Sequence, residues 1–277
     1  MDDCNPRKTP FADNSPIDSP SPEDTERPEL KEQFQKTIGE LRYIADSTRP
    51  DIFYAVNRLA QATHNPIQRH WNTLKLLMRY LKQTINHGVM YKSNKSNGTA
   101  NAPPLTSYSD ADFANDNIDR KSISGGVHLL YKSPIIWKSN KQQIQAHSTC
   151  EAEYISGTTA AQYTNWIRRM LFELHILDPK TPTPFYIDNE AAIKIATNQA
   201  PTRKRKFIHL RYHYLRDRVQ TKNIAIKHID SANMIADIFT KPLPRQRFLH
   251  NCSLLQVENP PEHELKRTPS SHRQGDC

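Results

Sequence analysis

The chain has 277 residues, a formal net charge of +9 and a mean hydropathy of −0.77. This length allows one or two domains with a hydrophobic core, and no apolar run is long enough to cross a bilayer. The acidic, polar first residues lack the features of a secretory signal peptide. The four cysteines show no paired spacing, which argues against a disulfide framework or a zinc site and predicts an intracellular protein. Because no long apolar run is present, no membrane partner is expected.

The charge is distributed unevenly along the chain. Residues 1–30 contain eight acids, three bases and six prolines, so we predict a disordered lead-in. The remaining residues then carry a net charge of +14. A body this basic favours a polyanionic partner such as nucleic acid, although a basic soluble protein without such a partner has the same composition.

The rest of the chain divides by its hydrophobic periodicity. Residues 31–92 repeat apolar side chains at helical spacing and predict a small helical subdomain, and the polar stretch 93–104 predicts a linker. Residues 105–245 predict the order β-β-β-α-β-α-α-β-α, which is typical of an α/β fold with a mixed sheet. Its last helix is expected to start after Ser231, and residues 246–277 are expected to form a mostly disordered tail.

Four acids fall at ends of the predicted elements or in apolar surroundings. Asp110 and Asp188 each follow a strand, Glu153 lies on the small-residue face of a long helix, and Asp237 stands among apolar neighbours. Carboxylates that cluster repel one another unless a cation neutralises them, and oxygen ligands suit Mg²⁺ or Mn²⁺. Each acid taken alone could equally be a solvated surface group.

Three further side chains compete for places in this site. Asp112 is the rival of Asp110, but we expect it to lie beyond the end of the strand. Glu151 is roughly 200° around the helix from Glu153 and is expected to point away. His228 lies near the last acid, on a predicted strand.

Six motifs in this region carry a family resemblance. The segment that contains them resembles the ribonuclease H domain of copia-type LTR retrotransposon Pol polyproteins. The preceding helices resemble the thumb and connection region that follows the polymerase core, so the chain resembles the C-terminal part of such a polyprotein. The motifs are Ser109–Ala114, Asp119–Gly126, Cys150–Tyr154, Ile187–Asn189, Ile208–His213 and Ala236–Pro244, and the helical matches are Thr48–Ile52 and His70–Lys82.

The resemblance implies a ribonuclease H-like fold, in which a mixed five-stranded sheet with flanking helices follows the helical subdomain. It implies that Asp110, Glu153, Asp188 and Asp237 are catalytic and hold two Mg²⁺ ions, with Mn²⁺ as a substitute and no small-molecule cofactor. It also makes His228 a candidate for the auxiliary histidine that helps product release in cellular ribonucleases H. The implied location is cytoplasmic and particle-associated.

The function implied is hydrolysis of the RNA strand of RNA–DNA hybrids during reverse transcription, with the polymerase part of the same polyprotein as a partner. Polymerase activity is not expected, because the chain has no Tyr-x-Asp-Asp motif. The alternative is a catalytically silent nucleic-acid-binding remnant of a transposon. A 3′–5′ exonuclease fits less well, because its first two acids usually share one strand as Asp-x-Glu.

Residues 201–222 contain eight bases and one acid, which predicts a ridge that follows a phosphate backbone. Discrimination of RNA from DNA then requires contacts to 2′-hydroxyl groups near the acids. His209 and His213 are spaced as a helical zinc pair, but no second pair stands nearby, so a structural or phosphate-contacting role is favoured. The predicted substrate-binding residues are Arg203, Lys204, Arg205, Arg211 and Arg218, together with Thr149 and Asn189 as 2′-hydroxyl candidates.

Overall fold

The computed structural model describes residues 5–11, 28–91, 103–114, 119–197 and 213–261. The main strands are β2 (Leu105–Asp112), β3 (Ile123–Leu130), β4 (Ser133–Lys141), β5 (Thr183–Ile187) and β6 (Ile224–His228). They form one sheet in the order β4-β3-β2-β5-β6. The β2, β3 and β4 neighbours are antiparallel, whereas β2, β5 and β6 run parallel, so the predicted α/β fold with a mixed five-stranded sheet is confirmed.

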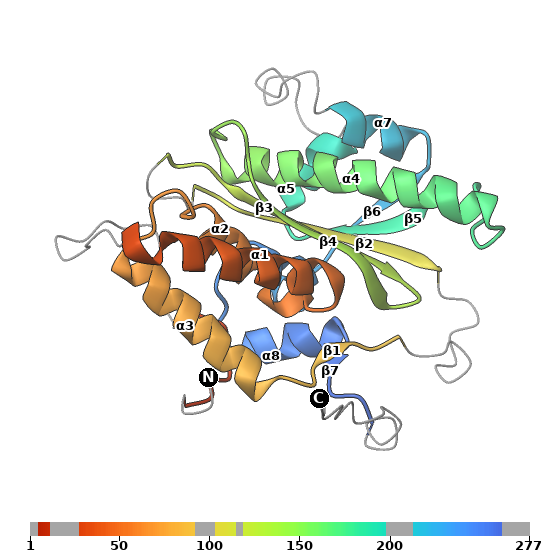
Figure 1. Cartoon of the computed structure of the whole chain (residues 1–277). Helices are drawn as coiled ribbons and strands as arrows, with labels where there is room; N and C mark the ends of the chain where they lie inside the picture. Colours follow the sequence, from red (N-terminus) through yellow and green to blue (C-terminus); the bar gives the residue numbers. More distant parts are fainter. Residues whose placement is uncertain (1–4, 12–27, 92–102, 115–118, 198–212, 262–277) are drawn as a thin grey trace.

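One face of this sheet is covered by the helices α4 (Thr149–Glu173), α5 (Glu190–Ala196) and α7 (Tyr214–Gln220) (Figure 1). The Ser148 hydroxyl caps α4 by accepting a hydrogen bond from the Glu151 amide. No helix in the described part of the chain has both the length and the apolar character needed to span a bilayer.

The opposite face is covered by a second helical layer (Figure 1). Its helices are α1 (Lys31–Ser47), α2 (Phe53–Ala60), α3 (Gln68–Gln83) and α8 (Arg245–Leu254), with 3-10 turns η1 (Pro28–Leu30) and η2 (Pro50–Ile52). Apolar side chains of these helices and of β3 and β4 form one continuous core. The Trp137 indole of β4 donates to the Ala45 carbonyl of α1 at 2.9 Å, so sheet and helical layer are also hydrogen-bonded.

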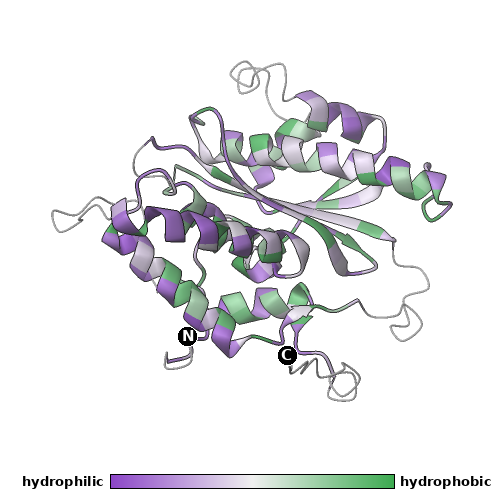
Figure 2. Ribbon diagram, viewed as in Figure 1, coloured by the Kyte–Doolittle hydropathy of each residue, from purple (hydrophilic) through white to green (hydrophobic). Residues whose placement is uncertain are grey.

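The helices of both layers alternate hydrophilic and hydrophobic positions along their length (Figure 2). This pattern is the one expected of amphipathic helices that bury one side against a sheet and leave the other in water. Burial of the apolar side therefore holds both layers in place, and most helical stability comes from this packing.

Both ends of the described chain are more ordered than the sequence predicts. Within the expected lead-in, Thr9, Pro10 and Phe11 are buried, and the Phe11 ring packs against Tyr54 at 5.6 Å. Within the expected tail, α8 forms a full helix, and β7 (Val257–Glu258) pairs with β1 (Gly88–Val89). The prediction of disorder is therefore wrong for residues 246–258, because their apolar side chains join the core between the sheet and the second helical layer.

The expected last helix is also wrong in type. Residues after β6 form two 3-10 turns, η5 (Ser231–Asn233) and η6 (Ile235–Phe239), separated by Met234 in an extended conformation. All five residues of η6 are buried, so the segment has no solvent face of the kind that the predicted amphipathic helix requires.

The turn η6 lies directly against β3 at Gly125. A Cβ atom at this position would come within 2.5 Å of the Thr240 side chain and 2.9 Å of the Ala236 carbonyl oxygen. At the neighbouring Gly126 the nearest atom would be 3.5 Å away, which is an ordinary contact. Gly125 therefore permits the close approach of η6 to the sheet.

We predict that Gly125→Ala lowers the free energy of unfolding by about 1–3 kcal/mol, because the backbone of η6 must shift to admit the methyl group. This loss exceeds the roughly 0.5–1 kcal/mol that a strand gains when glycine is replaced. The measurement is denaturant unfolding, with Gly126→Ala as the matched control, which should be neutral or raise the free energy of unfolding by up to about 1 kcal/mol. Equal losses in the two variants would contradict the close packing at Gly125.

Candidate metal centre

The sheet topology places Asp110 and Asp188 side by side. Strands β2 and β5 are parallel neighbours with Tyr108 opposite Tyr186, and continuing that register brings Asp110 beside Asp188. Because parallel strands end at the same edge, both carboxylates emerge at one edge of the sheet. Asp110 is buried, and Asp188 is half-buried.

Glu153 reaches this edge from α4. The helix lies close to β2 because small residues face the strand: the Ser156 hydroxyl donates to the Asp110 carbonyl at 2.7 Å, and Gly157 leaves room for Ile187. Side-chain oxygens of Asp110, Glu153 and Asp188 all lie within 4.8 Å of one another. Three elements that are far apart in the sequence thus bring three carboxylates together.

The Glu153 carboxyl is in an unusual electrostatic position. Burial, followed by the negative charges of Asp110 and Asp188, raises its pKa well above the usual value, and a hydrogen bond from the Ala111 amide only partly opposes this. Its Oε2 atom is buried and makes no hydrogen bond. A buried, repelled carboxylate with an unsatisfied oxygen is what a hard divalent cation would stabilise, so these residues fit Mg²⁺ or Mn²⁺.

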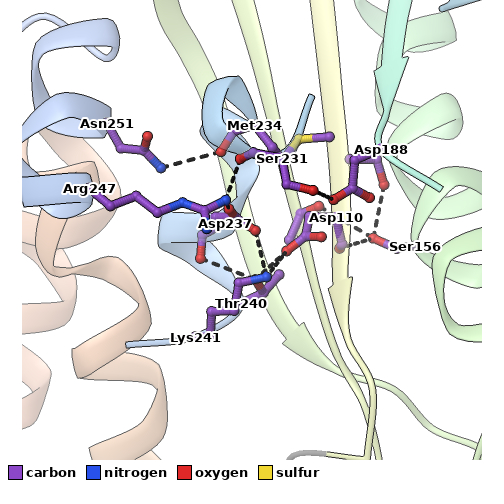
Figure 3. A network of polar contacts seen from close by, with 12 residues as sticks. Asp110, Ser156, Asp188, Ser231, Met234, Asp237, Thr240, Lys241, Arg247 and Asn251 are labelled. Carbon is purple, nitrogen blue, oxygen red and sulfur yellow. Dashed lines mark hydrogen bonds and ion pairs between the residues drawn. The ribbon is translucent and has the colours of Figure 1, made fainter. Parts of the chain in front are cut away.

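Asp237 lies next to this trio but is held by cations of its own (Figure 3). Lys241 Nζ lies 2.6 Å from Asp237 Oδ1 and 3.5 Å from Asp110 Oδ2, and the Arg247 guanidinium donates to Asp237 Oδ2. The Thr240 hydroxyl donates to Asp110. Asp237 therefore connects to the trio through Lys241, and its own oxygens are not among the three that converge.

The charges around Asp237 oppose one another. Burial and then the charge of Asp110 raise the pKa of Asp237, while Lys241 acts in the opposite direction. Burial alone would lower the pKa of Lys241, but the charges of Asp110 and Asp237 outweigh it and raise that pKa. The ammonium group of Lys241 therefore already compensates the negative charges of Asp110 and Asp237.

The two rival acids lie outside the cluster. Glu151 Oε2 accepts a hydrogen bond from the His147 amide at 2.8 Å, so its carboxylate serves the start of α4 and points away from Glu153. Asp112 is the last residue of β2, opposite Ile123 of β3, rather than beyond the strand as the sequence suggested. It does not belong to the converging trio.

The remaining predicted site residues lie around this edge. Thr149 is exposed one helical turn before Glu153, and the Asn189 side chain caps α5 by accepting from the Ala192 amide at 3.0 Å. His228 ends β6 and its Nε2 atom lies 3.1 Å from the Asp188 carbonyl oxygen. Ser231 donates to the Asp188 carboxylate at 2.9 Å.

The structure describes little of the predicted substrate ridge. Arg218 is described: its guanidinium pairs with Asp217 and lies 5.1 Å from the centre of the Tyr214 ring. His213 is described too, and burial followed by the charge of Arg216 lowers its pKa. The others lie outside the described residues, namely Arg203, Lys204, Arg205, Arg211 and His209.

Sequence reasoning missed Thr240, Lys241 and Arg247. The four-residue spacing of Asp237 and Lys241 was a usable signal, because such pairs adjoin in helical turns. Arg247 gives no such signal, because it lies ten residues from Asp237 and on another element.

No protein-family model matches the chain. The retrovirus-related Pol polyprotein from transposon RE2 of Arabidopsis thaliana is 38% identical over 78% of this chain and 14% of its own length. The corresponding polyprotein from transposon TNT 1-94 of Nicotiana tabacum is 32% identical over 79% of this chain and 16% of its own length. The chain thus spans about a seventh of the relatives that it matches.

Among solved structures, ribonuclease H1 of Halobacterium salinarum aligns with 49% of this chain and 93% of its own, at 14% identity and a TM-score of 0.38. That superposition is too weak to establish the fold, and the mixed sheet with its flanking helices is established by the strand pairing itself. Sequence identity to two plant polyproteins over more than three quarters of the chain decides its relationship: the chain is related to a stretch, about a seventh in length, of the retrovirus-related Pol polyproteins of copia-type retrotransposons.

Proposed function

We propose that this chain hydrolyses the RNA strand of RNA–DNA hybrids by metal-dependent, ribonuclease H-type chemistry. The observation that carries the proposal is the convergence of Asp110, Glu153 and Asp188 at one sheet edge, with one buried carboxylate oxygen unsatisfied. Divalent ions bound by such a cluster stabilise the attacking and leaving oxygens of a phosphodiester.

The proposal gives each acid a role. Asp110, Glu153 and Asp188 would hold two Mg²⁺ or Mn²⁺ ions. Asp237 would be the fourth ligand, because the Lys241 ammonium group lies between Asp237 and Asp110, at 2.6 and 3.5 Å, and a metal ion would take its place there. His228, hydrogen-bonded near Asp188, would be the auxiliary residue in product release. Thr149 shares a helical face with Glu153 and, with Asn189, would contact 2′-hydroxyl groups.

The partner proposed for the intact element is the polymerase part of the same polyprotein, and the hybrid would be the product of its synthesis. The Pol polyprotein relatives support this context. The proposed cellular location is a cytoplasmic particle.

The first test is Asp188→Asn, which we expect to abolish Mg²⁺-dependent cleavage of a labelled RNA–DNA hybrid. The amide keeps the shape of the side chain but removes one metal-ligand charge, so cooperative thermal unfolding should persist. The matched control is Glu190→Gln, an exposed acid two residues further on that pairs with Lys194, and it should leave cleavage intact. Cleavage retained by the Asp188 variant would place the reaction elsewhere.

A second test uses stability instead of activity. Glu153→Gln removes the repulsion between Glu153 and its two acidic neighbours, so the metal-free variant should be as stable as the parent or more stable, by roughly 1 kcal/mol. Mg²⁺ should raise the Tm of the parent because ions bind the native state, and this rise should be lost in the variant.

The control for that experiment is Glu151→Gln, two residues away. Its carboxylate caps the helix, so the variant should lose some stability yet keep the Mg²⁺-induced rise in Tm. If Mg²⁺ raises the Tm of the Glu153 and Glu151 variants equally, Glu153 is not a ligand.

The third test addresses the basic run before α7. Replacing Arg203, Lys204 and Arg205 with Ala should weaken hybrid binding and reduce the log–log salt slope by about 0.9 for each phosphate that the protein no longer neutralises. The cleavage rate at saturating hybrid should change little, because the run is not part of the carboxylate cluster. Binding measured by fluorescence anisotropy across a salt series decides this, and an unchanged slope would remove the run from the substrate path.

A further inference from the structure

A polar cavity of about 270 Å³ lies between α2 and the ends of β3 and β4. Its polar lining comes from Asn57 and Arg58 of α2, from Gln61 directly after that helix, and from Ser139, Asn140 and Lys141 of β4. We propose that this cavity binds a backbone phosphate of the RNA–DNA hybrid, several nucleotides from the cleaved bond. The inference rests on the proposed function and adds a contact made jointly by the helical layer and the sheet.

The cavity opens at the same sheet edge as the carboxylate cluster. Asp112 of β2 lies opposite Ile123 of β3, and Ile123 lies opposite Lys141 of β4, so these three residues form one row across the sheet. From strand geometry, Lys141 is about 12 Å from Asp110. Phosphates along one strand rise about 3.4 Å per nucleotide, so a duplex at the cluster would reach the cavity within roughly four base pairs.

The chemistry of the lining suits a phosphate. A guanidinium, an ammonium and three amide side chains line the cavity, and no carboxylate is among its lining residues. Lys141 pairs with Asp119 at 3.0 Å, but Lys121 shares that same carboxylate at 3.6 Å, so the local charge stays positive. Arginine, lysine and amide donors are the groups that proteins use to contact nucleic-acid phosphates.

The walls of the cavity are held in place before any ligand arrives. The Asn57 amide donates to the Ser139 carbonyl of β4 at 2.8 Å, which joins α2 to the sheet at this point. Arg58 is only 3% exposed, and its guanidinium donates to Gln61 at 3.2 Å. The volume lies just below the roughly 300–1,000 Å³ of small-molecule sites, which suits one sugar-phosphate unit better than a cofactor.

The test compares Lys141→Ala with Lys138→Ala. Both remove one positive charge from β4, but Lys138 lies on the other face of the sheet, with its Nζ 5.9 Å from the ring of Tyr163 in α4. Binding of intact hybrid is measured by fluorescence anisotropy without divalent metal, over a salt series. Lys141→Ala should lower affinity about fivefold and reduce the salt slope by about 0.9, and Lys138→Ala should do neither.

A second variant separates phosphate contact from a structural role. Asp119→Asn keeps Lys141 but removes its ion-pair partner, so hybrid affinity should stay the same or increase. If Asp119→Asn weakens binding as much as Lys141→Ala, the lysine acts only through the ion pair and the proposal is overturned.

A final experiment varies the length of the hybrid. With fewer than four base pairs on the cavity side of the cluster, the difference between the parent and Lys141→Ala should disappear. A difference that persists on such short hybrids, or is absent on long ones, overturns the cavity as a phosphate site. Because binding is measured without metal, a parent protein that binds hybrid but fails to cleave it would sink the proposed function alone.

Discussion

Repulsion among buried carboxylates is the constraint around which this molecule is organised. Asp110, Glu153 and Asp188 converge within 4.8 Å, and Asp237 is fully buried beside them. Such an arrangement is unfavourable unless positive charge or hydrogen-bond donors compensate it. Much of the compensation comes from the segment after β6. There the Thr240 hydroxyl donates to Asp110, and the Lys241 ammonium group pairs with both Asp110 and Asp237.

The compensating stretch depends in turn on the helical layer. Phe239 of η6 packs edge-on against Phe53 of α2, with ring centres 6.4 Å apart, and Phe248 of α8 packs in the same way against Tyr80 of α3. The Tyr80 hydroxyl donates to Asp51, which pairs with Arg49 through two hydrogen bonds at 2.9 and 2.7 Å. The second helical layer thus holds η6 and the adjoining Lys241 in place beside the acids, although none of its own helices contributes a member of the converging trio.

The sequence predicts the strands of the sheet, and three of the four acids that it singles out converge, because their positions depend on local signals. Asp110 lies near the carboxyl end of β2, Asp188 directly follows the buried strand β5, and Glu153 shares a helical face with small residues. Hydrophobic periodicity shows which face of a helix or strand is buried, but it does not show which other element packs against that face. The pairing of Asp237 with Arg247 depends on where α8 docks, and α8 buries only Phe248, Asn251 and Cys252, too few apolar side chains to give a periodic signal.

The pairing of β1 with β7 bears on how the protein is made. In the sequence, β1 precedes the five-stranded sheet and β7 follows it. Gly88 can therefore pair with Glu258 only after all the residues between them have been synthesised. Domains generally fold from the N-terminus as the chain leaves the ribosome. Here α1, α2 and α3 precede β3, β4 and α8 in the chain, and the core that these helices share with the sheet and α8 is complete only when the later elements have followed. The nascent helices therefore remain incompletely buried until α8 has been synthesised, and a chaperone or a protease would have access to them during that period.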